Sequence, residues 1–199
     1  MNAPLRVAIA DDDSEARDYL TEVLPRLGCE VVAVASSGHE LLEGCRAASP
    51  DLIITDVRMP DLDGIEAAAE VNRGGLIPVV LISAHHDQQI LGQLGRLPIM
   101  GYLVKPFTEG HLKATLAVAM VRFQQFQTLR QEADDLRQAL EDRKAIERAK
   151  GVLMRRLGLD EVDAYRRLRS TASSRNLKLI EVAKQVIAAE TVLSEFDRG

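Results

Sequence analysis

The sequence predicts an α/β fold, a doubly wound five-stranded parallel sheet, followed by a long linker helix and a small all-α module of three helices. Two observations lead to this prediction. Short apolar runs rich in β-branched residues alternate with helix-like segments, and these runs stop near residue 112, beyond which helix formers dominate. Strands that alternate with helices imply right-handed βαβ crossovers, and therefore a parallel sheet covered by helices on both faces.

Five short runs are the candidate strands. They are mostly apolar, as expected of strands buried on both faces. The runs are LRVAIA (5–10), CEVVAVA (29–35), LIITDV (52–57), PVVLIS (78–83) and MGYLVK (100–105). The helix-like segments between them are 14–28, 37–49, 63–73 and 87–95. The last of these is weakened by Gly92, because glycine disfavours a helix interior.

A continuous helical pattern extends from about residue 112 to 154, without Pro and without Gly before Gly151. Six residues within it follow the a and d spacing of a heptad: Phe126, Leu129, Ala133, Leu136, Leu140 and Arg143. About two and a half heptads are too few to identify a coiled coil from sequence. The stripe can pack on its own domain or form the seam of a homodimer, and the sequence leaves both interpretations open.

The remainder divides into helices at two breaks, LGLD and SSRN. Asp160 is a suitable N-cap for a helix over 161–173, with Asp163 three residues on. A last helix is expected over 177–196, with an apolar face made of Ile180, Ala183, Val186 and Ile187. The tail is therefore expected to be a three-helix module whose first helix continues the linker.

Charge is divided unevenly along the chain of 199 residues, whose formal net charge is −5. Residues 1–127 hold 10 Lys and Arg against 17 Asp and Glu, a balance of −7. Residues 143–184 hold 12 against 5, a balance of +7. The acidic total argues against a wholly basic nucleic-acid coat protein, and the segregation indicates two parts with different partners.

Cysteine content and hydropathy indicate an intracellular protein. Cys29 and Cys45 have no metal-ligand spacing, so reduced thiols are expected rather than a disulfide framework. No apolar segment resembles a signal peptide or approaches the length of a membrane span. The expected location is cytoplasmic, with no membrane partner.

Polar side chains stand where the predicted strands end: Asp11 and Asp12 after the first, Asp56 after the third, Ser83 after the fourth and Lys105 at the end of the fifth. Ligand sites of open parallel sheets lie at the carboxyl ends of the strands, so these residues are expected to meet. Three carboxylates in one crevice repel one another unless a hard cation such as Mg²⁺ and a lysine neutralise them. An aspartate beside that ion can act as a nucleophile toward a phosphoryl group.

Each of these aspartates alone also fits an ordinary strand end or helix N-cap. The five positions together favour a phosphoryl site. Ser83 can donate a hydrogen bond to the phosphoryl oxygens, and Lys105 can pair with their charge.

Four stretches resemble the receiver domains of two-component response regulators: VAIADDD, DLIITDVRMPDLDG, VVLISA and GYLVKPF. They occur in the family's order and spacing, and the resemblance covers residues 5 to about 122. It implies a flavodoxin-like receiver in which Asp56 is the phospho-acceptor and a histidine kinase is the donor. Asp11, Asp12, Asp56 and the carbonyl of Arg58 would then hold Mg²⁺.

The resemblance also implies a switch. Ser83 occupies the position of the switch Ser or Thr, and Tyr102 that of the switch aromatic. Lys105 precedes Pro106 in a Lys-Pro pair whose peptide bond is cis in the family. The modified protein is itself the product of phosphorylation, so the chain is not expected to be an enzyme.

Three further polar residues lie near this site. Arg58 and His85 occupy positions that tune the lifetime of the phosphoryl group in the family. Asp13 is left out of the metal site, because the family more often has Glu or another polar residue there.

The C-terminal part resembles the ANTAR domain, a three-helix RNA-binding output of transcription antitermination regulators. The matching residues are Ile146, AKGVLM (149–154), Ala164-Tyr165, Leu168-Arg169, Leu179 and Val182-Ala183. The resemblance implies binding of hairpin RNA that prevents transcription termination. The predicted division is a receiver domain over 1–122, a helical or coiled-coil linker over 123–145, and an ANTAR-type RNA-binding domain over 146–199.

Five side chains are candidates for RNA contacts: Lys150, Arg155, Arg156, Tyr165 and Arg169. The local charge excess suits phosphate contacts. Tyr165 can stack on an unpaired base or be a core aromatic, and the arginines can contact RNA or form an ordinary solvated face. Gly151 within a helix costs about 1 kcal/mol relative to Ala, which suggests close approach of another backbone, from protein or RNA.

Phosphorylation of Asp56 is expected to promote homodimerisation through the linker helix, so that two output modules engage two hairpins of one transcript. Two alternatives remain open for the output. It can bind duplex DNA as a transcription factor, or it can be a protein-interaction bundle whose basic face is incidental.

Overall fold

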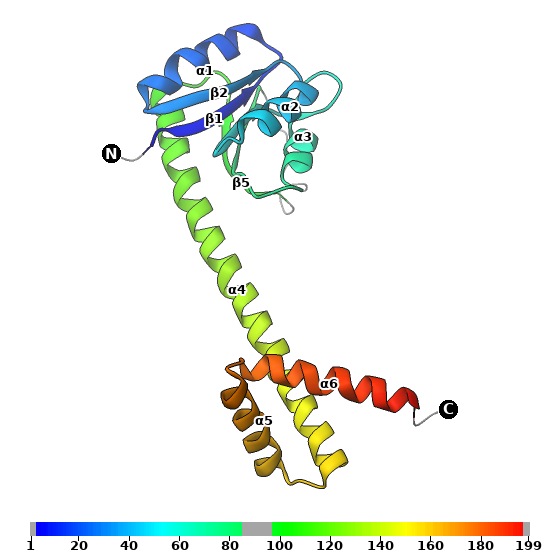
Figure 1. Ribbon diagram of the computed structural model, residues 1–199. Coiled ribbons are helices and arrows are strands. Elements are labelled where there is room, and N and C mark those ends of the chain that lie inside the picture. Colours follow the sequence, from blue (N-terminus) through cyan, green and yellow to red (C-terminus); the bar gives the residue numbers. More distant parts are fainter. Residues whose placement is uncertain (1–2, 85–96, 197–199) are drawn as a thin grey trace. The chain divides into compact units, whose positions relative to one another are not determined.

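The computed structural model describes residues 3–84 and 97–196, and the chain divides into two compact units, residues 1–127 and 128–199 (Figure 1). The predicted helix over 87–95 and His85 lie outside the described residues. The division between the units falls within the segment that the sequence predicts to be a linker.

The first unit is built on a five-stranded parallel sheet with the order β2-β1-β3-β4-β5. Its strands are β1 (Leu5–Ala10), β2 (Cys29–Ala35), β3 (Leu52–Asp56), β4 (Val79–Ser83) and β5 (Ile99–Val104). Every residue of β3 and β4 is buried. The doubly wound sheet is confirmed, and each strand ends within one residue of its predicted bounds, because a strand buried on both faces is a continuous apolar run.

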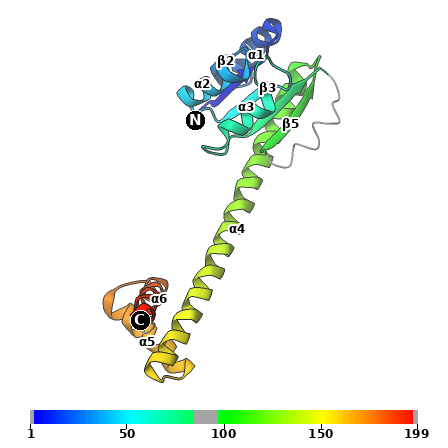
Figure 2. The same cartoon turned by 90° about the vertical axis from the view of Figure 1, so that its right-hand side faces the viewer.

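Helices cover both faces of the sheet (Figure 2). One face carries α1 (Ser14–Arg26) and the beginning of α4 (Glu109–Leu157), and the other carries α2 (Gly38–Ala48) and α3 (Gly64–Val71). Leu24 of α1 and Leu112 of α4 are fully buried on the first face. The helices therefore cover both faces of the sheet, and the edge where the strands end is the part that can form a binding site.

Helix α4 is continuous over 49 residues and belongs to both units. The uninterrupted pattern over 112–154 predicts it correctly, and the helix ends at Leu157, where Gly158 takes a φ of 64° that favours glycine. Neither α4 nor any other helix within the described residues is both long and apolar enough to cross a membrane.

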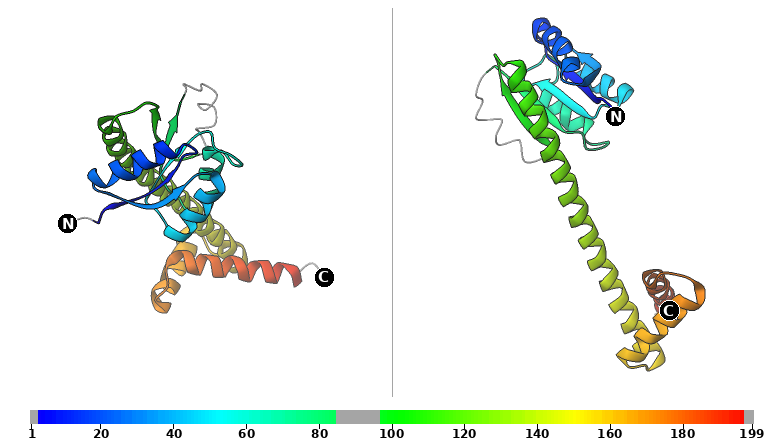
Figure 3. Two further views of the ribbon diagram at one scale, coloured as in Figure 1. Left: turned by 90° about the horizontal axis from the view of Figure 1, so that it is seen from above. Right: turned by 90° about the vertical axis from the view of Figure 1, so that its left-hand side faces the viewer.

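The second unit consists of the end of α4 with α5 (Glu161–Arg175) and α6 (Leu179–Phe196) (Figure 3). Asp160 caps α5 as predicted, since its carboxylate accepts the backbone N–H of Asp163 at 2.7 Å. The small core is formed by Ala149, Leu168, Ala172, Val182 and Ala183. The predicted three-helix module is confirmed.

Both cysteines are free thiols, and Cys45 is a buried residue of α2 that faces the core. Burial raises the pKa of the Cys45 thiol to about 11, and it also raises the pKa of Cys29. At pH 8 only about one thousandth of Cys45 is thiolate, which is the reactive form.

We expect iodoacetamide to label native Cys45 slowly at pH 8, with a rate that rises about tenfold per pH unit while the fold persists. Mass spectrometry of protein labelled with and without urea measures this, and equally fast labelling in both would contradict it.

Candidate functional site

Three aspartates meet at the carboxyl-terminal edge of the sheet. Asp56 is the last residue of β3, and Asp11 and Asp12 directly follow β1, its neighbour in the sheet. An oxygen of each carboxylate lies within 4.8 Å of the others, with Asp11 and Asp56 buried and Asp12 exposed. The strand order reverses between β1 and β3, which is where open α/β sheets bind ligands.

Lys105 follows β5 and places its ammonium group between the two buried carboxylates. Its Nζ donates to Asp56 Oδ2 at 2.6 Å and to Asp11 Oδ1 at 2.9 Å. Burial lowers the pKa of Lys105, but its hydrogen bonds to Asp11 and Asp56 outweigh burial and leave that pKa raised. Burial raises the pKa of Asp11, against the opposing effect of Lys105. Lys105 is therefore charged at neutral pH and offsets part of the negative charge of the cluster.

The donor set fits a hard divalent cation. Asp11 Oδ2 lies 2.7 Å from Lys105 Nζ but accepts no hydrogen bond, and it is the one buried side-chain polar atom without such a bond within the described residues. This oxygen is paired with the Lys105 charge, but without a hydrogen bond it keeps lone pairs that can ligate an ion. One lysine does not balance three carboxylates, and carboxylate oxygens are the ligands that Mg²⁺ prefers.

The loop after β3 positions Asp56 through its backbone. The N–H of Arg58 donates to Asp56 Oδ1 at 2.9 Å. Gly64 begins α3 so close to β3 that a Cβ there would lie 1.9 Å from the Asp56 carbonyl oxygen. Gly64 is a residue that sequence reasoning missed, although its place in the DLDG stretch was a usable signal. The carbonyl of Arg58 as a metal ligand stays a prediction.

The loop after β1 is held by α1. Asp13 is the N-cap of this helix, and its carboxylate accepts the N–H of Glu15 at 3.0 Å. Asp13 is accordingly outside the carboxylate cluster, as expected. Arg17 donates to the carbonyl oxygens of Asp11 at 2.7 Å and Asp12 at 3.0 Å. Sequence reasoning also missed Arg17, whose position one turn into the following helix was the available signal.

The predicted switch residues lie on the two strands at one end of the sheet. Ser83 ends β4 and is buried, and its carbonyl oxygen accepts the N–H of Lys105 at 2.9 Å. Tyr102 lies on β5 and is 38% exposed. The Lys105–Pro106 peptide bond is cis, as the resemblance implies.

The five candidate RNA contacts of the second unit differ in their surroundings. Lys150 is buried, and its Nζ binds Glu147 at 2.8 Å and Glu161 of α5 at 2.7 Å. The hydrogen bonds to Glu147 and Glu161 raise the pKa of Lys150. An ammonium group with two carboxylate partners joins α4 to the start of α5, which favours a structural role for this residue.

Arg156 and Arg155 lie beside α6. Arg156 Nε donates to Glu190 at 2.8 Å, whereas Arg155 is 68% exposed and its guanidinium is 4.0 Å from the same carboxylate. Tyr165 and Arg169 stand one turn apart on α5 and are both exposed. Tyr165 is 42% exposed, so the alternative that it is a core aromatic is wrong. Arg155, Tyr165 and Arg169 are therefore the exposed members of the predicted set, apart from Arg156, whose guanidinium is bound to Glu190.

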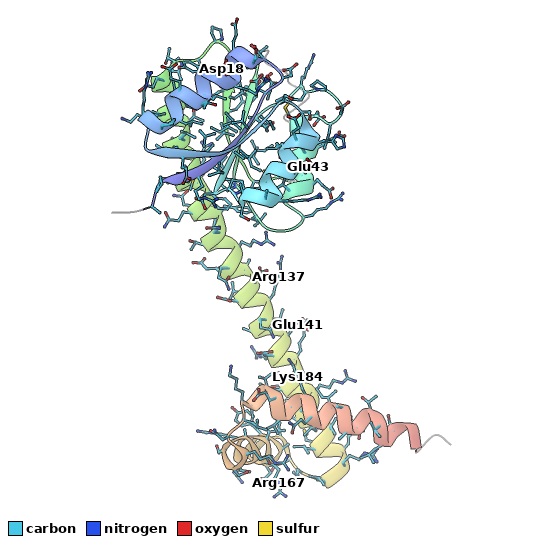
Figure 4. The ribbon with its side chains drawn as sticks, turned by 45° about the horizontal axis from the view of Figure 1, so that its top comes forward. Asp18, Glu43, Arg137, Glu141, Arg167 and Lys184 are labelled. Carbon is cyan, nitrogen blue, oxygen red and sulfur yellow. The ribbon has the colours of Figure 1, made fainter. Side chains whose placement is uncertain are left out.

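The heptad stripe of α4 is exposed. Leu129, Leu136 and Leu140 are 66%, 72% and 54% exposed, so the alternative in which the stripe packs on its own domain is wrong for these leucines. Arg137 and Glu141, which Figure 4 labels on the same stretch of helix, are exposed as well.

Comparison with known proteins accounts for both units. Residues 7–117 match the family described as response regulator receiver domain. The chain belongs to the response regulator family. Residues 134–187 of this response regulator match the ANTAR domain, so its output type is shown as well. Both families are regulatory rather than catalytic.

Relatives of this response regulator agree with the two assignments. It is 36% identical to the transcriptional regulatory protein PdtaR of Mycobacterium tuberculosis, over 92% of this chain and 90% of PdtaR. The solved receiver domain of the response regulator NarL from Mycobacterium tuberculosis is 34% identical with a TM-score of 0.55, and covers 60% of this chain and 98% of its own. A receiver domain from Clostridium thermocellum is 28% identical with a TM-score of 0.54, over 61% of this chain and 98% of its own.

Proposed function

We propose that a histidine kinase phosphorylates this response regulator on Asp56 in the cytoplasm, and that its ANTAR output then binds hairpin RNA and prevents transcription termination. One observation carries the proposal. Asp56 lies with Asp11, Asp12 and the Lys105 ammonium group at the edge of a receiver sheet, in a chain that also holds an ANTAR domain.

The chemistry is phosphoryl transfer between two side chains. The Asp56 carboxylate attacks the phosphorus of a phosphohistidine, the new O–P bond forms as the N–P bond breaks, and the histidine nitrogen keeps the electron pair and takes up a proton. Asp11, Asp12, Asp56 and the Arg58 carbonyl would hold Mg²⁺, which when bound neutralises charge on the phosphoryl oxygens. Lys105 and the Ser83 hydroxyl, both at this edge of the sheet, donate to the remaining oxygens.

We assign Ser83, Tyr102 and Lys105 to the switch. A phosphoryl group on Asp56 gives Lys105 a new charged partner and Ser83 a new acceptor. Ser83 and Tyr102 stand on adjacent strands, since β4 pairs with β5. A shift of Ser83 toward the phosphoryl group therefore changes the space beside Tyr102, which reaches the surface of the unit.

RNA recognition is assigned to the second unit, with the receiver over 1–122, the linker over 123–145 and the output over 146–199. Arg155 and Arg169 are exposed cations, and the exposed ring of Tyr165 suits stacking on an unpaired base. Arg156 reaches RNA only if it leaves Glu190, and Lys150 supports the fold beneath these residues. The stripe of exposed leucines on α4 supports a homodimer that phosphorylation promotes.

Competition binding tests the output. The phosphorylated full-length protein is offered hairpin RNA and duplex DNA of matched length, and hairpin RNA is expected to win. Preference for duplex DNA would favour a DNA-binding transcription factor, and binding to neither would favour a protein-interaction output. Sequencing the RNA that copurifies with the phosphorylated protein identifies its transcripts.

A further inference from the structure

Gly151 lies in the interior of α4, within the part of this helix that belongs to the second unit. Glycine is the least favourable helix residue apart from proline. Its neighbour Ala149 is buried in the small core, and Val152 is buried as well. At 100° per residue, Gly151 lies more than 90° around the helix from both, so it faces away from that core.

The fold itself does not require glycine at this position. Gly151 does not have a positive φ. A Cβ built there would meet one described side-chain atom, Arg155 Nη1 at 3.5 Å, which is an ordinary contact, and no backbone. Alanine would therefore fit and would favour the helix. The close approach that the sequence suggests does not come from the described part of this chain.

Cations flank the glycine on the same side of the helix. Lys144 lies seven residues before Gly151, Arg148 lies three residues before it, and Arg155 lies four residues after it. These three cations and Gly151 therefore lie within about 60° of one another around the helix axis. All three cations are exposed, although Lys144 pairs with Glu141 at 2.7 Å and Arg155 lies 4.0 Å from Glu190. Arg148 forms no hydrogen bond or ion pair with the described residues. Glu147, the nearest acidic residue of the turn, is bound to Lys150.

We propose that these four residues, Lys144, Arg148, Gly151 and Arg155, form a glycine face on which the sugar-phosphate backbone of RNA approaches α4. This inference rests on the proposed RNA-binding function and adds Lys144, Arg148 and Gly151 to the predicted contacts. Arg148 and Arg155 are seven residues apart, about 10 Å along the axis, and bind phosphates on either side of the glycine. The missing side chain lets the phosphate backbone lie close between them.

Charge favours RNA over a second copy of this helix. Two copies that crossed symmetrically at Gly151 would bring Arg148 and Arg155 of each chain against the same cations of the other. Such like-charge contacts are unfavourable, whereas a polyanion pairs with all of them.

The test is Gly151→Ala in the full-length phosphorylated protein. The probe is a tandem-hairpin RNA enriched from a randomised-loop library by the wild-type protein. We expect the melting temperature of the second unit to rise by roughly 4 °C, because alanine favours the helix. We expect the Kd for the RNA to rise by roughly tenfold, because the added methyl group displaces a phosphate contact. Gly110→Ala is the matched control on the same helix, where a Cβ meets Thr108 Oγ1 at 3.7 Å, and it should leave the Kd unchanged.

Wild-type affinity in Gly151→Ala would overturn the glycine face, and failure of the wild-type protein to enrich any RNA would overturn the proposed function with it. A change in the dimer dissociation constant at constant RNA affinity would show that a second copy occupies the face instead.

Arg148→Gln tests the charge independently of helix propensity. We expect this variant to make the plot of the logarithm of the RNA association constant against the logarithm of salt concentration less steep by about 1. Arg122 is an exposed arginine of α4 in the first unit, and Arg122→Gln should leave the slope unchanged. Equal slopes for the two variants would also overturn the inference.

Discussion

Asp56→Asn is expected to abolish phosphorylation of the protein by its histidine kinase or by acetyl phosphate. An amide is not a nucleophile toward phosphorus, and it carries no charge to pair with Lys105 or a cation. Asp56 is the one aspartate of the cluster that contacts both Lys105 Nζ, at 2.6 Å, and the Arg58 N–H, at 2.9 Å. Intact-protein mass spectrometry measures the incorporated phosphoryl group, and RNA affinity of the variant should no longer respond to the phosphodonor.

Asp13→Asn is the matched control for this substitution. Asp13 lies two residues from Asp11 in the same acidic run, but it caps α1 and lies outside the carboxylate cluster. Asparagine is an equally good N-cap, so the fold should be unaffected. Near-normal phosphorylation is expected. Phosphoryl incorporation in Asp56→Asn at the wild-type level would refute Asp56 as the acceptor.

A double substitution, Leu136→Asp with Leu140→Asp, is expected to abolish phosphorylation-dependent dimerisation. Both leucines are more than half exposed, so the change should leave the monomer folded. In a homodimer seam, four leucine side chains would each contribute roughly 1.5 kcal/mol, and their loss weakens association on the order of ten-thousandfold. Four aspartates at the seam would repel one another further.

Sedimentation with and without a beryllofluoride analogue measures this effect. Gln127→Asp with Gln138→Asp adds the same charge on the opposite side of α4, at exposed positions, and should dimerise like the wild type. A double-leucine variant that still dimerises would exclude the stripe as the seam. A wild-type protein that stays monomeric with the analogue would remove dimerisation from the proposed mechanism.

The strands and the aspartate site could be predicted from sequence for the same reason. Parallel strands buried on both faces are continuous apolar runs, and their carboxyl ends meet at one edge of the sheet. Once the order of strands and helices is known, Asp11, Asp56 and Lys105 have to converge. Arg17 and Gly64 could not be singled out, because their roles depend on where a carbonyl oxygen lies after the chain has folded.

The basic residues of the second unit were harder to separate. Arg155 and Arg156 are adjacent in the sequence, yet Glu190, 34 residues beyond Arg156, pairs closely with Arg156 and leaves Arg155 exposed. Lys150 lies in the AKGVLM motif and is a predicted RNA contact, but carboxylates of α4 and α5 surround its ammonium group. Arg167 on α5 and Lys184 on α6, labelled in Figure 4, are exposed cations that no motif distinguishes from the others.

The sequence by itself determined the order of the elements and the convergence of the aspartates, because both depend on local patterns and on the fixed geometry of a parallel sheet. Its motifs identified the ANTAR output. Only the tertiary structure decided which cations are already paired, which face of α4 is free of the small core, and that the leucine stripe is exposed. These depend on side chains that meet across helices, and residue identity alone does not reveal such partners.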